Sequence, residues 1–285
     1  MVGSVRIDEH SVRACLPKRQ PDSHKGSYGH VLAVVGRYGM AGAAMLCTEA
    51  VLRSGAGLVT AAVPASIYPM VTVAVPEAVC LPLGENAVEA VTAALDGKSA
   101  LVVGCGLGQS PETDELLSHT LAAANMPVVL DADGLNWLAA HTDKREAVSA
   151  PLCLTPHPAE MARLMGLSVA EVQQNRKAVA KACADRYRAV VVLKGHQTVV
   201  AKPDDSLVMI NPTGCSGMAV GGTGDVLAGL IAGLIAQGMA VDAAAAAGVY
   251  LHGAAGELAA KKHSQHAMLA RDLLAELGTL FLRYE

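Results

Sequence analysis

A glycine-rich loop that leads directly into an apolar helix is the segment of this 285-residue chain best suited to chemistry. It runs Asn211-Pro-Thr-Gly-Cys-Ser-Gly-Met-Ala-Val-Gly-Gly-Thr-Gly-Asp225. A helix N-terminus offers free N–H groups and a positive dipole end, so this junction suits a phosphate. Asp225 falls in the first turn, where its carboxylate either caps the helix or deprotonates a hydroxyl that attacks a phosphoryl group. Glycines at positions 217, 221, 222 and 224 favour the phosphate interpretation.

The familiar phosphate-binding motifs do not fit other parts of the chain. Gly97-Lys-Ser99 lacks the glycine of a P-loop five residues earlier and precedes a strand rather than a helix. Gly104-Cys-Gly-Leu-Gly108 follows a strand, but its last glycine comes one residue too early for a dinucleotide fingerprint. We interpret 104–108 as a close-approach loop where α/β sheets bind ligands, with a plain turn as the alternative.

Two carboxylates follow another apolar run, in Val129-Leu-Asp-Ala-Asp-Gly-Leu-Asn136. Asp131 and Asp133 are two residues apart, so in an extended chain their side chains share one side. They are candidates for holding a metal ion or a ligand hydroxyl. The alternative is a local turn in which Asp133 or Asn136 caps a helix.

Two further strand ends carry polar candidates. In Leu154-Thr-Pro-His-Pro-Ala-Glu160, two prolines bracket His157, and such a rigid loop suits a ligand. A purely structural His157, with Glu160 opening a helix, is the alternative. Val192-Leu-Lys-Gly-His-Gln-Thr-Val-Val200 predicts a hairpin whose Lys194 meets a phosphate, the alternative being a solvated turn lysine. His252 is predicted to be a packing residue.

The elements that must position these residues alternate along the chain. Apolar runs that predict strands lie at 31–35, 58–63, 101–103, 128–130, 190–193 and 198–201. Helical stretches lie at 41–54, 111–124, 158–164, 169–186, 223–237, 241–261 and 268–276. This alternation predicts an α/β fold whose parallel sheet is covered on both faces, in a single domain over 1–285. Residues 1–24 are polar and are expected to form an N-terminal arm or a short capping helix.

Composition and charge exclude several classes of protein. Lysine and arginine number 22 and aspartate and glutamate 26, giving a net charge of −4, which argues against a nucleic-acid partner. No apolar stretch reaches the ~20 residues that a bilayer requires, and the charged N-terminus is not a signal peptide. The seven cysteines are scattered and form no CxxC pair. We therefore expect reduced thiols and a cytoplasmic protein without a membrane partner.

The motifs, taken in order, resemble the ADP/ATP-dependent NAD(P)H-hydrate dehydratase family of the ribokinase-like superfamily. The matching segments are 25–36, 53–60, 103–108, 130–136, 154–160, 193–195 and 211–225. The resemblance implies a ribokinase-like three-layer α/β/α sandwich with a mostly parallel central sheet. It also implies a lyase that repairs NADHX and NADPHX, in which water has added at C6 of the nicotinamide ring. The family phosphorylates that C6 hydroxyl with ADP or ATP and then expels phosphate.

The resemblance also assigns roles to individual residues. It implies that Asp225 is the catalytic base and a substrate contact, and that Gly221, Gly222, Thr223 and Gly224 form the anion hole. The implied nucleotide-binding residues are Lys194, Gly195, His196, Gln197, Thr198 and Gly224. The implied contacts to the hydrated dinucleotide are Ala43, Gly106 and His157. By analogy with more distant kinases of this fold, Glu160 orders a water on Mg²⁺.

The family resemblance further implies a homotetramer and a functional partnership with an NAD(P)HX epimerase. Members often carry the epimerase as an upstream domain; this chain begins too late to hold one, so we expect a stand-alone dehydratase.

The sequence departs from the family at two loops. Cys215-Ser216 stand for Asn-Pro, Val220 stands for Thr, and Gly36-Arg37-Tyr38 stands for Gly-Gly-Ser. These departures leave Asp225 intact and bear on loop rigidity and substrate affinity.

Two alternative functions share these features. One is a small-molecule kinase of the same fold, acting on a vitamin alcohol such as hydroxyethylthiazole. The other is a catalytically dead nucleotide-binding module, against which the intact Asp225 argues. The sequence leaves open the preference between ADP and ATP, and between NADHX and NADPHX.

Overall fold

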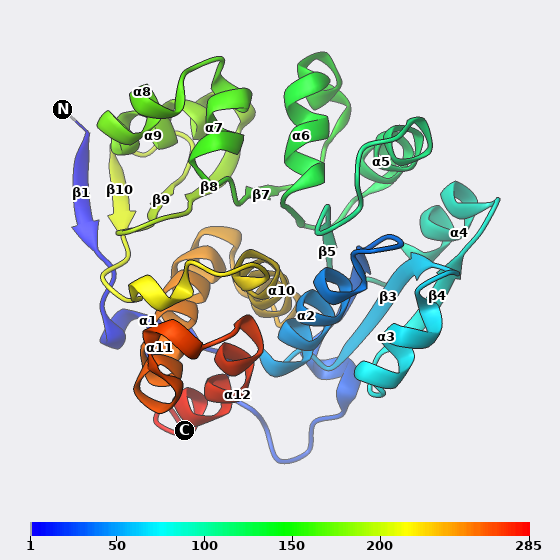
Figure 1. Cartoon of the computed structure of the whole chain (residues 1–285), viewed down its shortest axis with the longest axis horizontal. Coiled ribbons are helices and arrows are strands. Elements are labelled where there is room, and N and C mark those ends of the chain that lie inside the picture. Colours follow the sequence, from blue (N-terminus) through cyan, green and yellow to red (C-terminus); the bar gives the residue numbers. More distant parts are fainter. Residues whose placement is uncertain (1) are drawn as a thin grey trace.

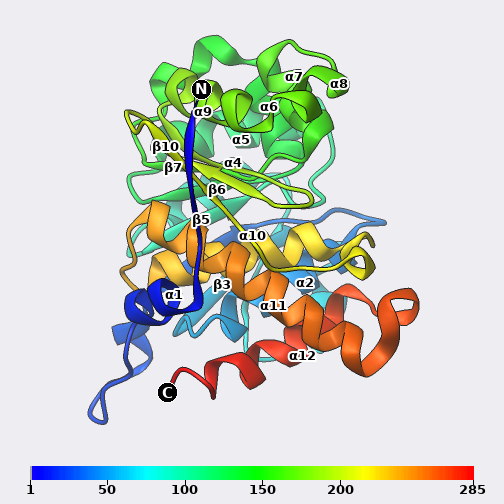
Figure 2. The same ribbon diagram turned by 90° about the vertical axis from the view of Figure 1, so that its left-hand side faces the viewer.

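The computed structural model describes residues 2–285, in which helices cover both faces of a ten-stranded sheet (Figure 1 and Figure 2). The strands are β1 (Gly3–Arg6), β2 (His30–Val34), β3 (Leu58–Pro64), β4 (Val79–Leu83), β5 (Ala100–Val103), β6 (Val128–Leu130), β7 (Leu152–Leu154), β8 (Ala189–Leu193), β9 (Val199–Ala201) and β10 (Leu207–Ile210). The helices are α1 (Glu9–Cys15), α2 (Ala41–Arg53), α3 (Tyr68–Ala74), α4 (Ala87–Ala94), α5 (Pro111–Ala123), α6 (Asp133–Ala140), α7 (Pro158–Met165), α8 (Val169–Gln174), α9 (Arg176–Tyr187), α10 (Thr223–Ala236), α11 (Val241–Ala267) and α12 (Ala270–Phe281).

The strand order across the sheet is β1-β10-β9-β8-β7-β6-β5-β2-β3-β4. Neighbouring strands pair in parallel except at β10–β9 and β9–β8, so β9 alone of these ten runs against the rest. The predicted mostly parallel α/β sandwich is therefore confirmed. The chain proceeds outward from β2 in one direction and from β5 in the other, and such a switch point is where open sheets bind ligands.

Both faces of the central strands are buried, as continuous apolar runs predict. In β2, Val31 and Ala33 pack on the side of α2 and α10, whereas Leu32 and Val34 pack on the side of α5 and α6. This alternation follows from the period of two in a strand. None of the described helices combines the length and apolar character that crossing a bilayer requires.

Helix α10 is held against α2 by close approaches at two glycines, one to backbone and one to a side chain. A Cβ on Gly229 would lie 2.2 Å from the backbone oxygen of Cys47, and one on Gly233 would lie 1.8 Å from the Ser54 hydroxyl Oγ. Glycine is therefore required at both positions for α10 to sit beneath the sheet. From Val226 to Ala236 every residue of α10 is buried, whereas its first turn, which carries Asp225, is only half-buried.

The elements at the N-terminus and at the sheet edges differ most from expectation. The predicted arm contains α1 and also β1, which extends the sheet by pairing in parallel with β10. All four residues of β1 are exposed, so it carries no hydrophobic alternation that would reveal a strand. The single helix predicted at 169–186 is wrong in one respect, because Asn175 separates α8 from α9.

Candidate active site

The register of the sheet aligns the ends of four central strands. Val103 pairs with Leu130, Leu130 with Leu154, and Leu154 with Val191. The loops that follow these strands therefore start side by side and carry Cys105, Asp131, Thr155 and Lys194. The first turn of α10 lies against the same edge: a Cβ on Gly224 would be 3.4 Å from Lys194 Nζ and 3.9 Å from Asp131 Oδ2.

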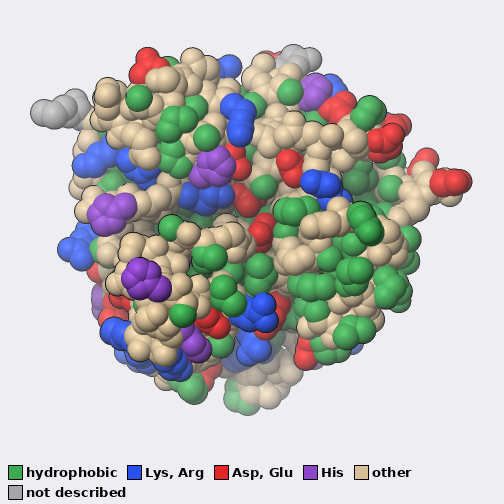
Figure 3. All heavy atoms as spheres, viewed as in Figure 1, with side chains coloured by type: hydrophobic (Ala, Val, Ile, Leu, Met, Phe, Trp, Pro, Cys, Tyr) green, Lys and Arg blue, Asp and Glu red, His purple; other side chains and the backbone are tan. Residues whose placement is uncertain are grey.

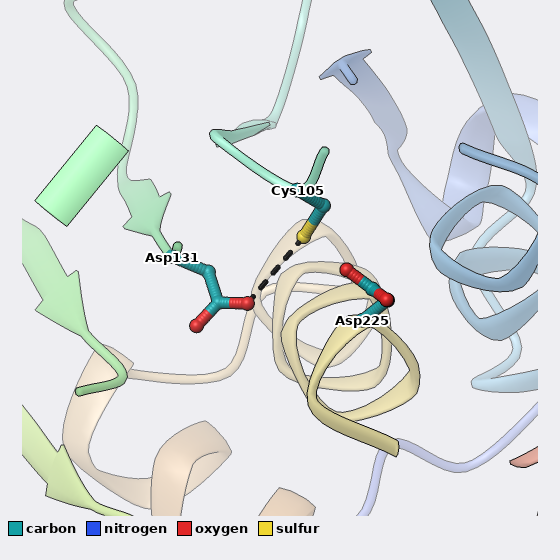
Figure 4. A group of neighbouring side chains, drawn as sticks. All are labelled: Cys105, Asp131 and Asp225. Atoms are coloured by element: carbon teal, nitrogen blue, oxygen red, sulfur yellow. Dashed lines mark hydrogen bonds between the residues drawn. The ribbon is translucent and has the colours of Figure 1, made fainter. Parts of the chain in front are cut away.

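Asp225 lies at the centre of this convergence. Its carboxylate, the Asp131 carboxylate and the Cys105 thiol point toward one another, with one atom of each within 4.8 Å of the others (Figure 4). The alternative that Asp225 caps the helix is wrong, because the N-cap is Gly222 and, within the described part of the chain, no side chain caps α10. Burial raises the pKa of Asp225 to about 6, and repulsion from Asp131 adds to it. A buried carboxyl with a raised pKa suits a general base.

Asp131 is buried and heavily bonded. Its Oδ1 accepts hydrogen bonds from Thr155 Oγ1 at 2.6 Å and Lys194 Nζ at 2.7 Å, and its Oδ2 accepts one from Cys105 Sγ at 3.6 Å. The expectation that Asp131 and Asp133 share one side of an extended chain is wrong. Ala132 has φ of 46°, which turns the chain, and α6 begins directly after it. Asp133 Oδ2 instead accepts from Gly108 N at 2.7 Å, which ties the 104–108 loop to α6.

Lys194 links Asp131 to the start of α7. Its Nζ is 3.8 Å from Glu160 Oε2 as well as 2.7 Å from Asp131 Oδ1. Burial acts against the charge of Lys194, but attraction by Asp131 and Glu160 prevails and raises the pKa of its ammonium. Lys194 therefore remains a buried cation beside the glycine loop, not the solvated turn lysine of the alternative.

His157 and Glu160 form the capping box of α7. His157 Nδ1 accepts from Ala159 N at 3.1 Å and from Glu160 N at 3.3 Å, while Glu160 Oε2 accepts from His157 N at 2.7 Å. Burial and the nearby Lys194 lower the pKa of His157, which keeps the ring neutral and able to accept. The His157 side chain is 46% exposed. The histidine thus performs the structural role that the sequence left open and still presents a ring surface for a ligand.

Glu160 does not suit a direct metal ligand. Both carboxylate oxygens are engaged, Oε1 by His157 Nε2 at 3.3 Å and Oε2 by the His157 backbone, and an ammonium lies nearby. Burial raises the pKa of this carboxyl, which also disfavours its charged form. The Cys105, Asp131 and Asp225 group does not suit Mg²⁺ either, because Mg²⁺ prefers oxygen ligands and Lys194 already compensates Asp131. Only a contact through water is compatible with Glu160.

The loop that leads to Asp225 is fixed by its own side chains. Gly222 has φ of 96°, and Thr223 Oγ1 donates to Met218 O and Val220 O, both at 3.1 Å. His252 Nε2 lies 2.9 Å from Thr223 O, and burial lowers the pKa of His252 to about 4, so a neutral ring donates to that carbonyl. The packing role predicted for His252 is therefore confirmed.

The remaining predicted residues lie around this centre. Ala43 and Gly106 lie against each other: Gly106 has φ of 64°, and a Cβ on it would be 2.8 Å from Ala43 Cβ. Residues 195–198 form the exposed turn of the predicted hairpin between β8 and β9, with Thr198 Oγ1 donating to Gly195 O at 2.9 Å. Figure 3 shows charged and histidine side chains across the middle of this face, with others at its upper and lower edges.

Two residues of the centre were missed in the sequence. Cys105 and Thr155 belong to no motif that predicts a role for them, yet both hydrogen-bond Asp131. The only indication in the sequence is their position, because each residue lies one or two places after the end of a predicted strand.

The two residues that replace Asn-Pro in the family loop both contact α11. Cys215 Sγ lies 3.7 Å from Gly256 O of that helix. Ser216 hydrogen-bonds Gln265 of the same helix.

A cavity of about 990 Å³ lies at the other end of α10. It is lined by Leu234 and Gln237, by the segment after α2, and by residues from the N- and C-terminal segments. None of the predicted site residues lines it. The chemical centre is therefore the strand-end cluster, where Asp225, Asp131 and Lys194 converge, rather than this cavity.

A mostly parallel α/β/α sandwich with a half-buried carboxylate at the glycine-led start of a helix is an arrangement of the ribokinase-like class. Residues 31–278 match the family model of NAD(P)H-hydrate dehydratase. The chain belongs to this family.

Relatives and solved structures agree with this assignment. The bifunctional NAD(P)H-hydrate repair enzyme Nnr of Moorella thermoacetica is 46% identical over 270 residues, covering 92% of this chain and 51% of that protein. The ADP-dependent (S)-NAD(P)H-hydrate dehydratase of Bacillus subtilis is 39% identical, covering 97% of this chain and 98% of that protein. The crystal structure of a Bacillus subtilis ADP/ATP-dependent NAD(P)H-hydrate dehydratase, co-crystallized with ATP/Mg²⁺, has a TM-score of 0.85 at 34% identity, covering 100% of both chains. The chain spans about half the length of the bifunctional relatives it matches.

Proposed function

We propose that this chain dehydrates (6S)-NADHX and (6S)-NADPHX to NADH and NADPH, with ADP or ATP as phosphoryl donor. The observation that carries the proposal is Asp225, a half-buried carboxyl with a pKa raised to about 6 at the start of a glycine-led helix. Lys194, beside that helix start, adds a cation where a phosphate would lie. Family membership supplies the substrate class.

The reaction assigns one task to each group. Asp225 takes the proton of the C6 hydroxyl, whose oxygen attacks the terminal phosphoryl group of ADP or ATP. The bridging P–O bond breaks and AMP or ADP leaves. The N–H groups of Gly222, Thr223 and Gly224, with Gly221 in the same loop and Lys194 nearby, face the charge that develops on the phosphoryl group. The ring nitrogen then expels phosphate from C6, and loss of a C5 proton restores the dihydronicotinamide.

Binding is divided between two sides of the cluster in this proposal. Ala43, Gly106 and His157 contact the hydrated dinucleotide, since the first two lie together at the switch point and His157 exposes part of its ring. The turn of residues 194–198, together with Gly224, holds the nucleotide. Glu160 would contact Mg²⁺ through water, and the ion, bound together with the nucleotide, would neutralise the charge of its phosphates.

The proposal extends to the working form of the protein. Residues 1–285 act as one dehydratase unit in a homotetramer. The enzyme works in the cytoplasm together with an NAD(P)HX epimerase, which supplies the S form of the substrate.

Incubation with hydrated NADH, Mg²⁺ and either ADP or ATP tests the proposal. The expected result is growth of the dihydronicotinamide absorbance with release of one phosphate and one shortened nucleotide per NADH. A stable phosphate ester without that absorbance would establish a kinase of the same fold. If the protein binds both substrates but shows no turnover with either nucleotide, it would be a catalytically dead binding module.

A further inference from the structure

The two carboxylates of the centre have opposite surroundings. Asp131 is only 2% exposed, and its oxygens accept bonds from Thr155, Lys194 and Cys105. Asp225, among the described residues, receives no hydrogen bond from a hydroxyl, amide or ammonium group. Asp131 is therefore bound in one position and has little capacity left for a substrate proton, whereas Asp225 can accept one. Carboxylates whose environments diverge in this way take different roles in a reaction.

We propose that Asp131 is a positioning residue that keeps Asp225 an effective base by holding a fixed negative charge beside it. The inference rests on the role of Asp225 proposed above. Thr155 and Lys194 fix the Asp131 carboxylate, one oxygen of which lies within 4.8 Å of an oxygen of Asp225. A negative charge at this distance makes the neighbouring carboxylate hold a proton more strongly.

Lys194 explains why such a charge is needed. The anion hole requires a cation for the phosphates, but a cation beside Asp225 would weaken its affinity for a proton. Lys194 stands at the start of α10, and its charge is compensated by Asp131 at 2.7 Å and by Glu160 at 3.8 Å. The pair thus places a cation at the phosphate position while the base keeps its strength.

Other groups that face Asp225 contribute less to this effect. The Cys105 thiol lowers the pKa of Asp225, as Lys194 does, and Asp133 raises it less than Asp131 does. Asp133 is also bonded to Gly108 N. His252, from α11, meets the same turn through Thr223 O and is neutral near pH 7. Glu160 acts through Lys194. Asp131 is therefore the main charge that strengthens the base.

The variant Asp131→Asn removes this charge with little change of shape. The measurement is kcat/KM for hydrated NADH from pH 5 to 8 at saturating ADP, which reports the base in the ADP-bound enzyme before hydrated NADH binds. Wild-type enzyme should lose activity on the acid side with an inflection near pH 6. In Asp131→Asn we expect that inflection to fall by about one pH unit or more. Thr155→Val is the matched control: it removes a hydrogen bond to the same carboxylate but keeps the charge, and its inflection should stay at the wild-type position.

An unshifted inflection in a folded Asp131→Asn variant would overturn the proposal, as would an equal shift in Thr155→Val. If Asp131→Asn does not fold, the double variant Asp131→Asn with Lys194→Met removes the ion pair as a whole. Its inflection should still lie below that of the wild type, because Asp131 affects Asp225 more than Lys194 does; an inflection at the wild-type value would overturn the proposal. A wrong assignment of Asp225 as the base would be detected by a different result, namely undiminished turnover by Asp225→Asn.

Discussion

The ammonium of Lys194 lies 2.7 Å from Oδ1 of Asp131. A lysine that the sequence assigns to a nucleotide phosphate thus already holds a buried carboxylate, and it does so at the start of α10. An ammonium has three donors, so these contacts leave Lys194 able to meet a phosphate as well. The charges of Lys194, Asp131 and Glu160 are therefore coupled. A substitution of one of them also removes the charge partner of another, and the two effects must be measured separately.

Asp225→Asn should abolish most turnover. Loss of a positioned general base costs about 10²–10⁴-fold in rate, and Asn cannot take the C6 hydroxyl proton. We expect kcat to fall by that factor while ADP binding, measured by calorimetry, is retained. Turnover by Asp225→Asn above a tenth of the wild-type rate would show that another residue is the base.

The same variant should change how stability depends on pH. The pKa of Asp225 is about 6 in the folded protein against 3.8 for an ordinary aspartate, so folding favours the protonated carboxyl. Well below pH 3.8 both states are protonated and there is no penalty. As the pH rises through 3.8 toward 6 the unfolded chain loses its proton first, and the folded wild type loses up to about 3 kcal/mol of stability.

Asp225→Asn does not lose this stability, because asparagine carries no titratable carboxyl. Relative to the wild type it should gain stability between pH 4 and pH 7, as measured by urea unfolding of both proteins at the two pH values. A stability difference that is the same at both values would contradict the raised pKa.

Lys194→Met should weaken both nucleotide binding and the fold. It removes the phosphate cation, so KM for ADP should rise. It also leaves Asp131 buried without its counter-ion, which costs about 3–5 kcal/mol of unfolding free energy. The double variant with Asp131→Asn removes both charges, and its unfolding free energy should recover much of that loss while KM for ADP stays high. Equal stability of the single and double variants would show that the ion pair is not the cause.

The sequence revealed the parts of the site that are local and concealed those that depend on the sheet. Asp225 and its glycines lie in one segment whose composition indicates a phosphate-binding helix start. Cys105 and Thr155 become neighbours only because Val103, Leu130 and Leu154 share one row of the sheet. A register of this kind involves residues far apart in the chain, and no motif records it.

Backbone geometry and edge strands set the other limits. The direction of Asp133 depends on the positive φ of Ala132, a conformation that alanine seldom adopts and that the sequence does not signal. The central strands were found because they are apolar and buried. The edge strand β1 is exposed along its whole length, so its sequence has no alternation of apolar and polar residues that would predict a strand.

His157→Asn should separate the two roles of the histidine. Asparagine is among the best N-cap residues, so its side chain can replace Nδ1 as acceptor for the first N–H groups of α7, and the melting temperature should stay near that of the wild type. The ring surface is lost, and KM for hydrated NADH should rise about 3- to 10-fold, because the substrate loses an apolar packing contact worth about 1 kcal/mol. His157→Ala is the matched control, because it should raise KM equally but also cost about 1 kcal/mol through the lost cap. Dependence on ADP and Mg²⁺ should be unchanged in both variants, since Glu160 remains. A normal KM in folded His157→Asn would mean that His157 serves only to start α7, and a changed Mg²⁺ requirement would move it to the nucleotide side of the site.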